Sequence, residues 1–194
     1  MATDNRYRKE MEAIDDKMQA GYQKLREDYR ADACRIWLEV WKEILNVMDS
    51  NGIKTLNEFD EKFSGREHVG VWVYDFEREL ANAGCRDKKF LSDRILFCEE
   101  FIRRSPDEDN IREMKRAVAE SWFQLGETDK AEKMFGELLS CDPRWGWGWI
   151  AWSDCYWLKD DDIRNPEKAE ELLKRGLAVP RVKDKQHILR NLRV

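Results

Sequence analysis

The side chains best suited to chemistry are few and scattered along this chain. The sequence holds only two histidines, His68 and His187, and neither a Gly-x-Ser-x-Gly nor a His-Glu-x-x-His motif. Cys155 follows Asp154 and would suit a nucleophile only if a histidine came near, whereas a thiol among apolar residues is more often buried and inert. We therefore expect no catalytic residue, no metal and no cofactor.

Two further segments have the composition of a binding site. Lys159 to Asp162 contains three consecutive aspartates, which suit calcium or a basic partner, but the alternating ligands and final Glu of an EF-hand loop are missing. A solvated loop is the favoured interpretation. Gly146 and Gly148 alternate with tryptophans, without the Lys and Ser/Thr of a phosphate loop. We expect these glycines to let wide indole rings pack against the preceding helices.

Composition favours a protein of amphipathic helices. The 194 residues include 39% charged and 42% hydrophobic residues, with only 4 Pro and 10 Gly. Nine tryptophans must fill helix interfaces or a binding groove, because an indole is costly to leave in water. The net charge of −5 disfavours binding to the negatively charged phosphate backbone of nucleic acid.

Cysteine usage and hydropathy predict a cytoplasmic chain. The five cysteines are odd in number and never form a C-x-x-C pair, as expected in a reducing compartment. The first ten residues are polar and charged, unlike a signal peptide. No apolar run approaches the roughly 20 residues of a spanning helix, so we expect no membrane association.

The N-terminal residues 1–33 are predicted to form a charged amphipathic helix, separate from a domain at 34–194. Its apolar residues recur at steps of three and four within residues 4–33: Met11, Ile14, Met18, Tyr22, Leu25 and Tyr29. This single stripe fits a helix laid against the body of the protein, or a coiled-coil arm that makes a homodimer. Both interpretations stay open from the sequence.

The rest of the chain is predicted to be all-α. Asn51-Gly52 and Gly126 favour helix ends, and Asn165-Pro166 favours a helix start. Periodicity and these signals predict helices over 34–48, 54–63, 68–83, 88–104, 110–125, 129–140, 145–158, 166–178 and 184–192.

Residues 117–177 carry a repeat. The repeated pattern comprises Ala119, Trp122, Leu125, Gly126, Ala131, Phe135 and Pro143. Ala131 and Ala169 match in role 38 residues apart, close to a repeat unit of about 34. The spacing resembles a tetratricopeptide repeat, which implies an antiparallel helix-hairpin array, an α-solenoid, with pairs near 67–104, 110–141 and 145–178. Such arrays present surface for binding.

A second resemblance covers roughly residues 35–180. It rests on Phe59-Asp60, on residues 79–84 and 94–98, and above all on the tryptophan-rich segment 145–158. These segments resemble the bacterial tetratricopeptide-like helical domains found in proteins with a SEC-C motif. The cysteine-rich zinc-binding tail of that motif is absent here, so no metal site is carried over.

The tetratricopeptide pattern implies which residues line the concave face of the array. The partner-binding candidates are Arg116, Glu120, Phe123, Gln124, Trp147, Ile150, Asp154, Trp157 and Leu158. Phe123, Trp147 and Trp157 would anchor a partner, because aromatic and Arg side chains dominate interface energies. The competing interpretation is that Trp147 caps the stack and Trp157 is core.

These observations favour a non-enzymatic interaction module, an adaptor, regulator or inhibitor, that binds a partner protein or peptide. Two alternatives remain at this point. Helical repeats with stacking aromatics also bind single-stranded nucleic acid, although the net negative charge makes that partner unlikely. A self-assembling protein joined through residues 4–33 is the other alternative.

Overall fold

The computed structural model describes residues 2–157 and 164–192, with side chains described from residue 7 onward. This part of the chain holds ten α-helices and no strand, which confirms the predicted all-α class. The chain divides into two compact units, residues 1–111 and 112–194. Leu158 and the aspartate run at 160–162, both singled out from the sequence, lie outside the described residues.

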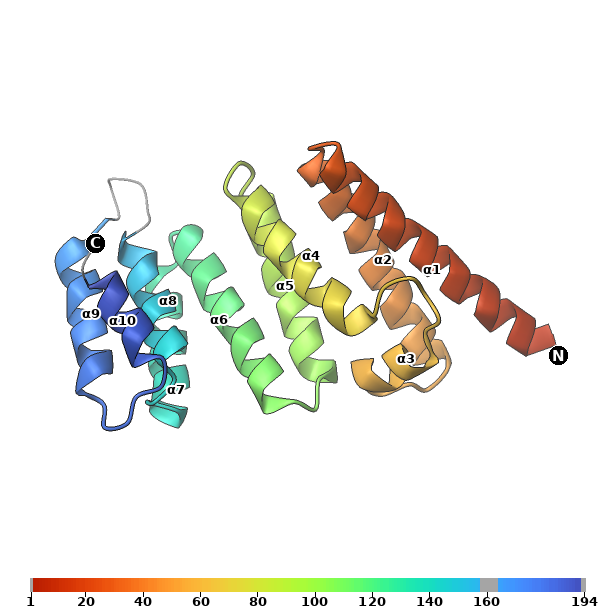
Figure 1. The fold of residues 1–194 in the computed structure, drawn as a ribbon. Helices are drawn as coiled ribbons and strands as arrows, with labels where there is room; N and C mark the ends of the chain where they lie inside the picture. Colours follow the sequence, from red (N-terminus) through yellow and green to blue (C-terminus); the bar gives the residue numbers. More distant parts are fainter. Residues whose placement is uncertain (1, 158–163, 193–194) are drawn as a thin grey trace. The chain divides into compact units, whose positions relative to one another are not determined.

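Unit 1 is built from two long helix pairs and one short helix. Their bounds are α1 (Ala2–Arg26), α2 (Arg30–Ser50), α3 (Leu56–Lys62), α4 (Val69–Gly84) and α5 (Lys89–Arg104). α1 lies along α2, α2 packs on α4, and α4 also contacts α3 and α5 (Figure 1). The aromatic rings of Trp37, Trp72 and Phe76 meet in the core of this unit.

The predicted domain boundary at 33/34 is wrong, because it falls inside α2. The first helix ends at Arg26, and the chain turns through Asp28, whose φ of 63° is left-handed. Aspartate adopts this conformation more readily than most residues. The apolar stripe hid this turn, since it continues across it to Tyr29, which is 57% exposed.

The apolar stripe of α1 is buried within its own unit. Met11, Ile14 and Met18 are at most 3% exposed, and α1 packs on α2. The indole nitrogen of Trp37 donates a hydrogen bond of 3.0 Å to the carbonyl of Met18. The helix is therefore laid against the body, and the stripe that suggested a dimerisation arm is already used by intramolecular packing.

Unit 2 comprises the remaining helices. They are α6 (Glu108–Gln124), from Arg112 onward, α7 (Thr128–Cys141), α8 (Gly146–Trp157), α9 (Pro166–Ala178) and α10 (Lys185–Asn191). Gly126 has a φ of +87° between α6 and α7, as the turn signal predicts. The Asn165 side chain accepts a hydrogen bond from the Lys168 backbone N–H, so the predicted cap of α9 is confirmed.

The small and aromatic residues of the repeat pattern meet in the core of unit 2. Ala119, Ala131 and Phe135 are fully buried in one cluster that joins α6, α7, α8 and α9. Phe135 stacks on Trp152 with an interplanar angle of 7°. Alanine at these positions lets neighbouring helices approach closely while the aromatic rings fill the remaining gaps.

Replacing Gly148 with alanine is expected to destabilise unit 2 by about 1–3 kcal/mol, the usual cost of overpacking. A β-carbon there would lie 2.3 Å from Cε3 of Trp145 and 3.0 Å from a methyl group of Leu139. The control is Gly136→Ala on α7, where an added β-carbon meets nothing within 4 Å. Urea unfolding followed by circular dichroism should show a loss at Gly148, and a gain of about 0.5–1 kcal/mol at Gly136. Equal effects of the two substitutions would contradict this packing.

Candidate functional site

The candidate site is organised around α8, which is apolar on nearly every side. Eight of its residues are buried: Gly146, Gly148, Trp149, Ile150, Ala151, Trp152, Ser153 and Cys155. A helix of this kind must be covered by several neighbours. It packs on α7, α9 and α10, and it shares the hydrophobic core with α6.

Hydrogen bonds fix the aromatic side chains that face this core. The Trp149 indole donates to the carbonyl of Pro143 at 2.9 Å. On α7, the Glu132 carboxylate accepts hydrogen bonds from the Trp152 indole and, at 2.8 Å, from the Tyr156 hydroxyl. These bonds satisfy the polar ends of two buried indoles and one half-buried phenol, so α8 is held in one rotational setting.

Phe123 is corrected from a partner anchor to a core residue. Its side chain is fully buried in the cluster of unit 2, with its ring 4.9 Å from that of Tyr156 in an edge-to-face arrangement. The repeat pattern places this position on the inner side of α6, but α8 covers it. A partner therefore cannot reach Phe123 in this structure.

Five of the candidate residues line one surface hollow of about 460 Å³, which we call the Trp147 groove. One wall comes from α6 and the other from α8. On each helix the lining residues recur at steps of three or four positions and so share one face. The lining residues are Glu113, Arg116, Glu120, Trp147, Ile150, Ala151 and Asp154. Arg116, Glu120, Trp147 and Asp154, which the repeat pattern assigns to the concave face, thus line one hollow.

Trp147 is the exposed aromatic residue of the groove. It is 46% exposed, whereas Trp145, Trp149 and Trp152 are at most 6% exposed. The imidazole of His187 on α10 lies 4.9 Å from its ring. Trp147 is thus supported from one side and open on the other, as a contact residue for a partner must be.

Carboxylates outnumber cations in the Trp147 groove. Arg116 pairs with Glu113 at 2.9 Å and with Glu120, both on its own helix. Its guanidinium is thereby engaged within α6, so the predicted role of Arg116 in pairing with a partner's charge is weakened. Because Asp154 adds a third carboxylate, the groove carries two negative charges in excess of its one arginine.

Asp154 is the most perturbed acid of the candidate site. Burial, and secondarily the nearby charge of Glu120, raise the pKa of its carboxyl group from the ordinary 3.8 to about 6. Within residues 7–157 and 164–192, its side chain makes no hydrogen bond and no ion pair. An isolated half-buried carboxylate is unfavourable unless something neutralises it.

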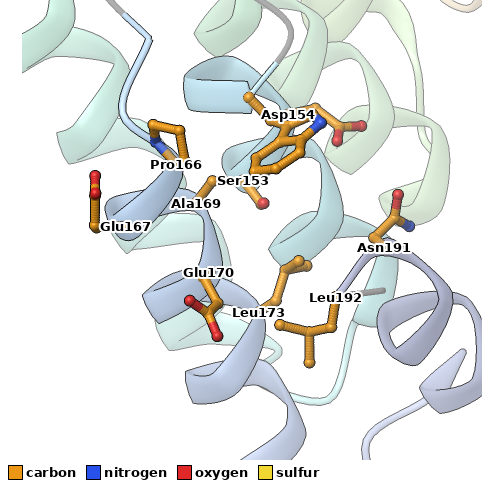
Figure 2. Close-up of a pocket in the computed structure, with 10 residues that line it drawn as sticks. Ser153, Asp154, Pro166, Glu167, Ala169, Glu170, Leu173, Asn191 and Leu192 are labelled. Carbon is orange, nitrogen blue, oxygen red and sulfur yellow. The ribbon is translucent and has the colours of Figure 1, made fainter. Parts of the chain in front are cut away.

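A second hollow, of about 530 Å³, opens on the other side of Asp154, and we call it the Ser153 pocket. Helices α8, α9 and α10 contribute its walls (Figure 2). The lining residues are Ser153, Asp154, Trp157, Pro166, Glu167, Ala169, Glu170, Leu173, Asn191 and Leu192.

The repeat pattern had assigned Asp154 and Trp157 to the concave face, but Trp157 lines this pocket and not the Trp147 groove, and the contribution of α9 and α10 was missed. Glu167 and Glu170 are three residues apart on one face of α9, which was the available signal. Trp157 is half-buried, with the guanidinium of Arg164 at 5.5 Å over its ring. Gln124, half-buried at the end of α6, lines neither hollow.

Cys155, the possible nucleophile, is buried. Cys155 is 4% exposed and belongs to the core cluster of unit 2. Its thiol therefore faces the interior, although Asp154 precedes it on the helix. Within the described part of the chain, no three His, Cys, Asp or Glu side chains converge to hold a metal ion.

No protein-family model matches the chain. A search of curated proteins finds no significant match. Among residues 2–157 and 164–192, no helix is both long enough and apolar enough to cross a membrane.

Proposed function

We propose that this chain is a non-enzymatic interaction module whose unit 2 binds a partner protein or peptide along the Trp147 groove. The observation that carries the proposal is the indole of Trp147, exposed between α6 and α8 while the neighbouring tryptophans are buried. An exposed indole in a groove of this size is the typical anchor of a protein interface. An adaptor, a regulator and an inhibitor share this mechanism.

The helix pairs support a tetratricopeptide-like arrangement as part of the proposal. The successive helices α6 and α7 cover 108–141, α8 and α9 cover 146–178, both close to the predicted positions, and α8 packs on α9. α6, α8 and α10 would be the first helices of successive pairs. They carry Arg116, Trp147 and His187, the residues that surround the groove or touch its tryptophan. The resemblance and the five free cysteines also favour a bacterial cytoplasmic setting.

Charge disfavours nucleic acid as the partner. Proteins bind the phosphate backbone of nucleic acids through clustered Lys and Arg side chains. Carboxylates predominate in both hollows instead, and the whole chain has a net charge of −5. A basic or neutral protein surface is the better match.

Replacing Trp147 with serine is expected to abolish partner capture without unfolding the protein. Tagged wild type, Trp147→Ser and Leu96→Ser are compared in affinity capture from a lysate. Leu96 is the matched control, because it is 65% exposed and belongs to unit 1, whereas only residues of unit 2 line the groove. We expect a protein that wild type and Leu96→Ser retain equally, depleted about tenfold by Trp147→Ser, as for an interface anchor.

Capture alone does not establish the interface, so the retained protein is then purified and titrated calorimetrically against the same three variants. Circular dichroism checks that each variant is folded. If Trp147→Ser binds as tightly as wild type, the groove is not the interface and the proposal is wrong.

A further inference from the structure

The Ser153 pocket combines the hydroxyl of a largely buried serine, carboxylates that pair with no described residue, and an apolar wall. We propose that it receives the side chain of a lysine or arginine from the segment that occupies the adjoining Trp147 groove. This inference rests on the proposed function, because Asp154 borders both hollows and places the pocket beside the groove. It adds the chemical class of the partner, which the groove alone does not define.

Ser153 is the first feature that points to a ligand. Its residue is only 3% exposed, yet it lines the pocket, and no hydrogen bond joins its hydroxyl to another described residue. Buried polar side chains are almost always satisfied, by protein or by solvent. A serine hydroxyl accepts hydrogen bonds as well as donating one, so it suits an incoming ammonium or guanidinium group.

The carboxylates make the pocket negatively charged. Asp154 and Glu167 form no ion pair within the described part of unit 2, whereas Glu170 pairs with Lys174 at 2.6 Å. Figure 2 shows Glu167 and Glu170 on one side of the opening and the amide of Asn191 on the other. Among the described cations nearby, Lys168 pairs with Glu171, and Arg164 lies over the ring of Trp157 at the edge of the pocket.

The apolar wall suits the stem of a basic side chain. Trp157, Pro166, Ala169, Leu173 and Leu192 line the pocket between the polar groups. Lysine and arginine bury their methylene stems along such surfaces while their charged ends reach polar partners. The pocket volume of about 530 Å³ lies within the range of about 300–1,000 Å³ typical of ligand sites.

The same features reject the alternatives. A phosphate or an acidic side chain would bring negative charge against Asp154 and Glu167, which pair with no residue in the described part of the chain, and like charges in such a site are repelled. A purely apolar side chain would leave the Ser153 hydroxyl and the Asp154 carboxylate buried beneath it without partners. Only a cation with an apolar stem satisfies both parts of the pocket.

The test uses defined probes on the full-length chain. N-acetyl-arginine amide and N-acetyl-lysine amide are titrated into the ¹⁵N-labelled protein at pH 7.5 and followed by two-dimensional NMR. The matched neutral probes are N-acetyl-citrulline amide and N-acetyl-norleucine amide. We expect saturable shifts confined to the backbone around Ser153, Pro166–Leu173 and Asn191 with one or both cationic probes. The neutral probes should bind at least about tenfold more weakly, as expected when a charge-assisted hydrogen bond is lost.

Two variants make the assignment specific. Asp154→Asn should weaken the cationic probe about tenfold, since it removes the central charge. Glu137→Gln is the control, because it changes the net charge equally on α7 and outside both hollows. Equal binding of charged and neutral probes, shifts elsewhere, or no shifts would overturn the inference.

The result is separable from that of the proposed function. If partner binding requires Trp147 but the cationic probes do not bind the pocket, the inference about the pocket is wrong and the proposed function stands. If the probes bind as expected but no partner depends on Trp147, the groove proposal fails alone.

Discussion

Replacing Phe123 with alanine is expected to lower the free energy of unfolding of unit 2 by about 3–5 kcal/mol, the usual cost of removing a buried phenylalanine. Its ring is fully buried, meets Tyr156 edge to face, and joins the cluster that binds four helices together. The loss combines the transfer of apolar surface to water with the cavity that remains between α6 and α8. Urea unfolding followed by tryptophan fluorescence and circular dichroism measures it.

Trp147→Ala is the matched comparison. Because Trp147 is 46% exposed, its removal is expected to cost no more than about 1 kcal/mol, well below the cost at Phe123. The critical result is which of the two variants loses more free energy of unfolding. If Phe123→Ala were the milder of the two, the assignment of core and surface on α6 and α8 would be reversed. A binding defect of Phe123→Ala would in any case reflect unfolding, which is why the groove is tested at Trp147.

Replacing Asp154 with asparagine is expected to stabilise unit 2 at pH 7 by about 1–3 kcal/mol. Folding raises the pKa of this carboxyl from 3.8 to about 6, by burial first and by Glu120 second. The folded state therefore holds the proton more tightly, and stability falls as pH rises from about 4 through 6. Two pKa units correspond to roughly 3 kcal/mol, an upper bound for a half-exposed group.

The pH dependence gives this prediction its signature. The stability advantage of Asp154→Asn should be present at pH 7 and vanish near pH 3.5, where the acid is protonated in both states. The groups that face Asp154 are Glu120 and Arg116 across the groove and Glu167 across the pocket, and they remain in both proteins. Glu137→Gln should show no such trend. An Asp154→Asn variant that is less stable at pH 7 would contradict the account of this residue.

A residue that destabilises the free protein can strengthen a complex. The free energy lost by burying the Asp154 carboxylate without a partner is recovered when a cation neutralises it. Asp154→Asn is accordingly expected to be more stable and yet bind a basic side chain less well. Such a trade between stability and activity is common at binding sites.

The sequence predicted the elements of the fold better than their assembly. Helices were found because their apolar residues recur at helical spacing and because Gly126 and Asn165 end or begin them in the expected conformations. The turn at Asp28 was missed, since the apolar stripe runs through it and no Gly or Pro marks it. Whether the helix pairs form a continuous tetratricopeptide-like array remains a proposal.

The candidate site was predicted in part for a similar reason. The resemblance to a tetratricopeptide repeat assigned Arg116, Glu120, Trp147 and Asp154 to one face, and these four line one groove. Spacing cannot show which neighbour covers a helix face, so Phe123 was placed outside the core that buries it. The Ser153 pocket depends on how α10 crosses α8 and α9, a tertiary feature with no local signal in the sequence.

The most direct test of the central claim is calorimetric titration of the purified partner against wild type, Trp147→Ser and Leu96→Ser. The account predicts equal affinity for wild type and Leu96→Ser, and an affinity reduced by about tenfold or more for Trp147→Ser, the usual effect of losing an interface anchor. Equal affinity for all three proteins, with Trp147→Ser folded, would contradict the claim that the Trp147 groove is the binding surface.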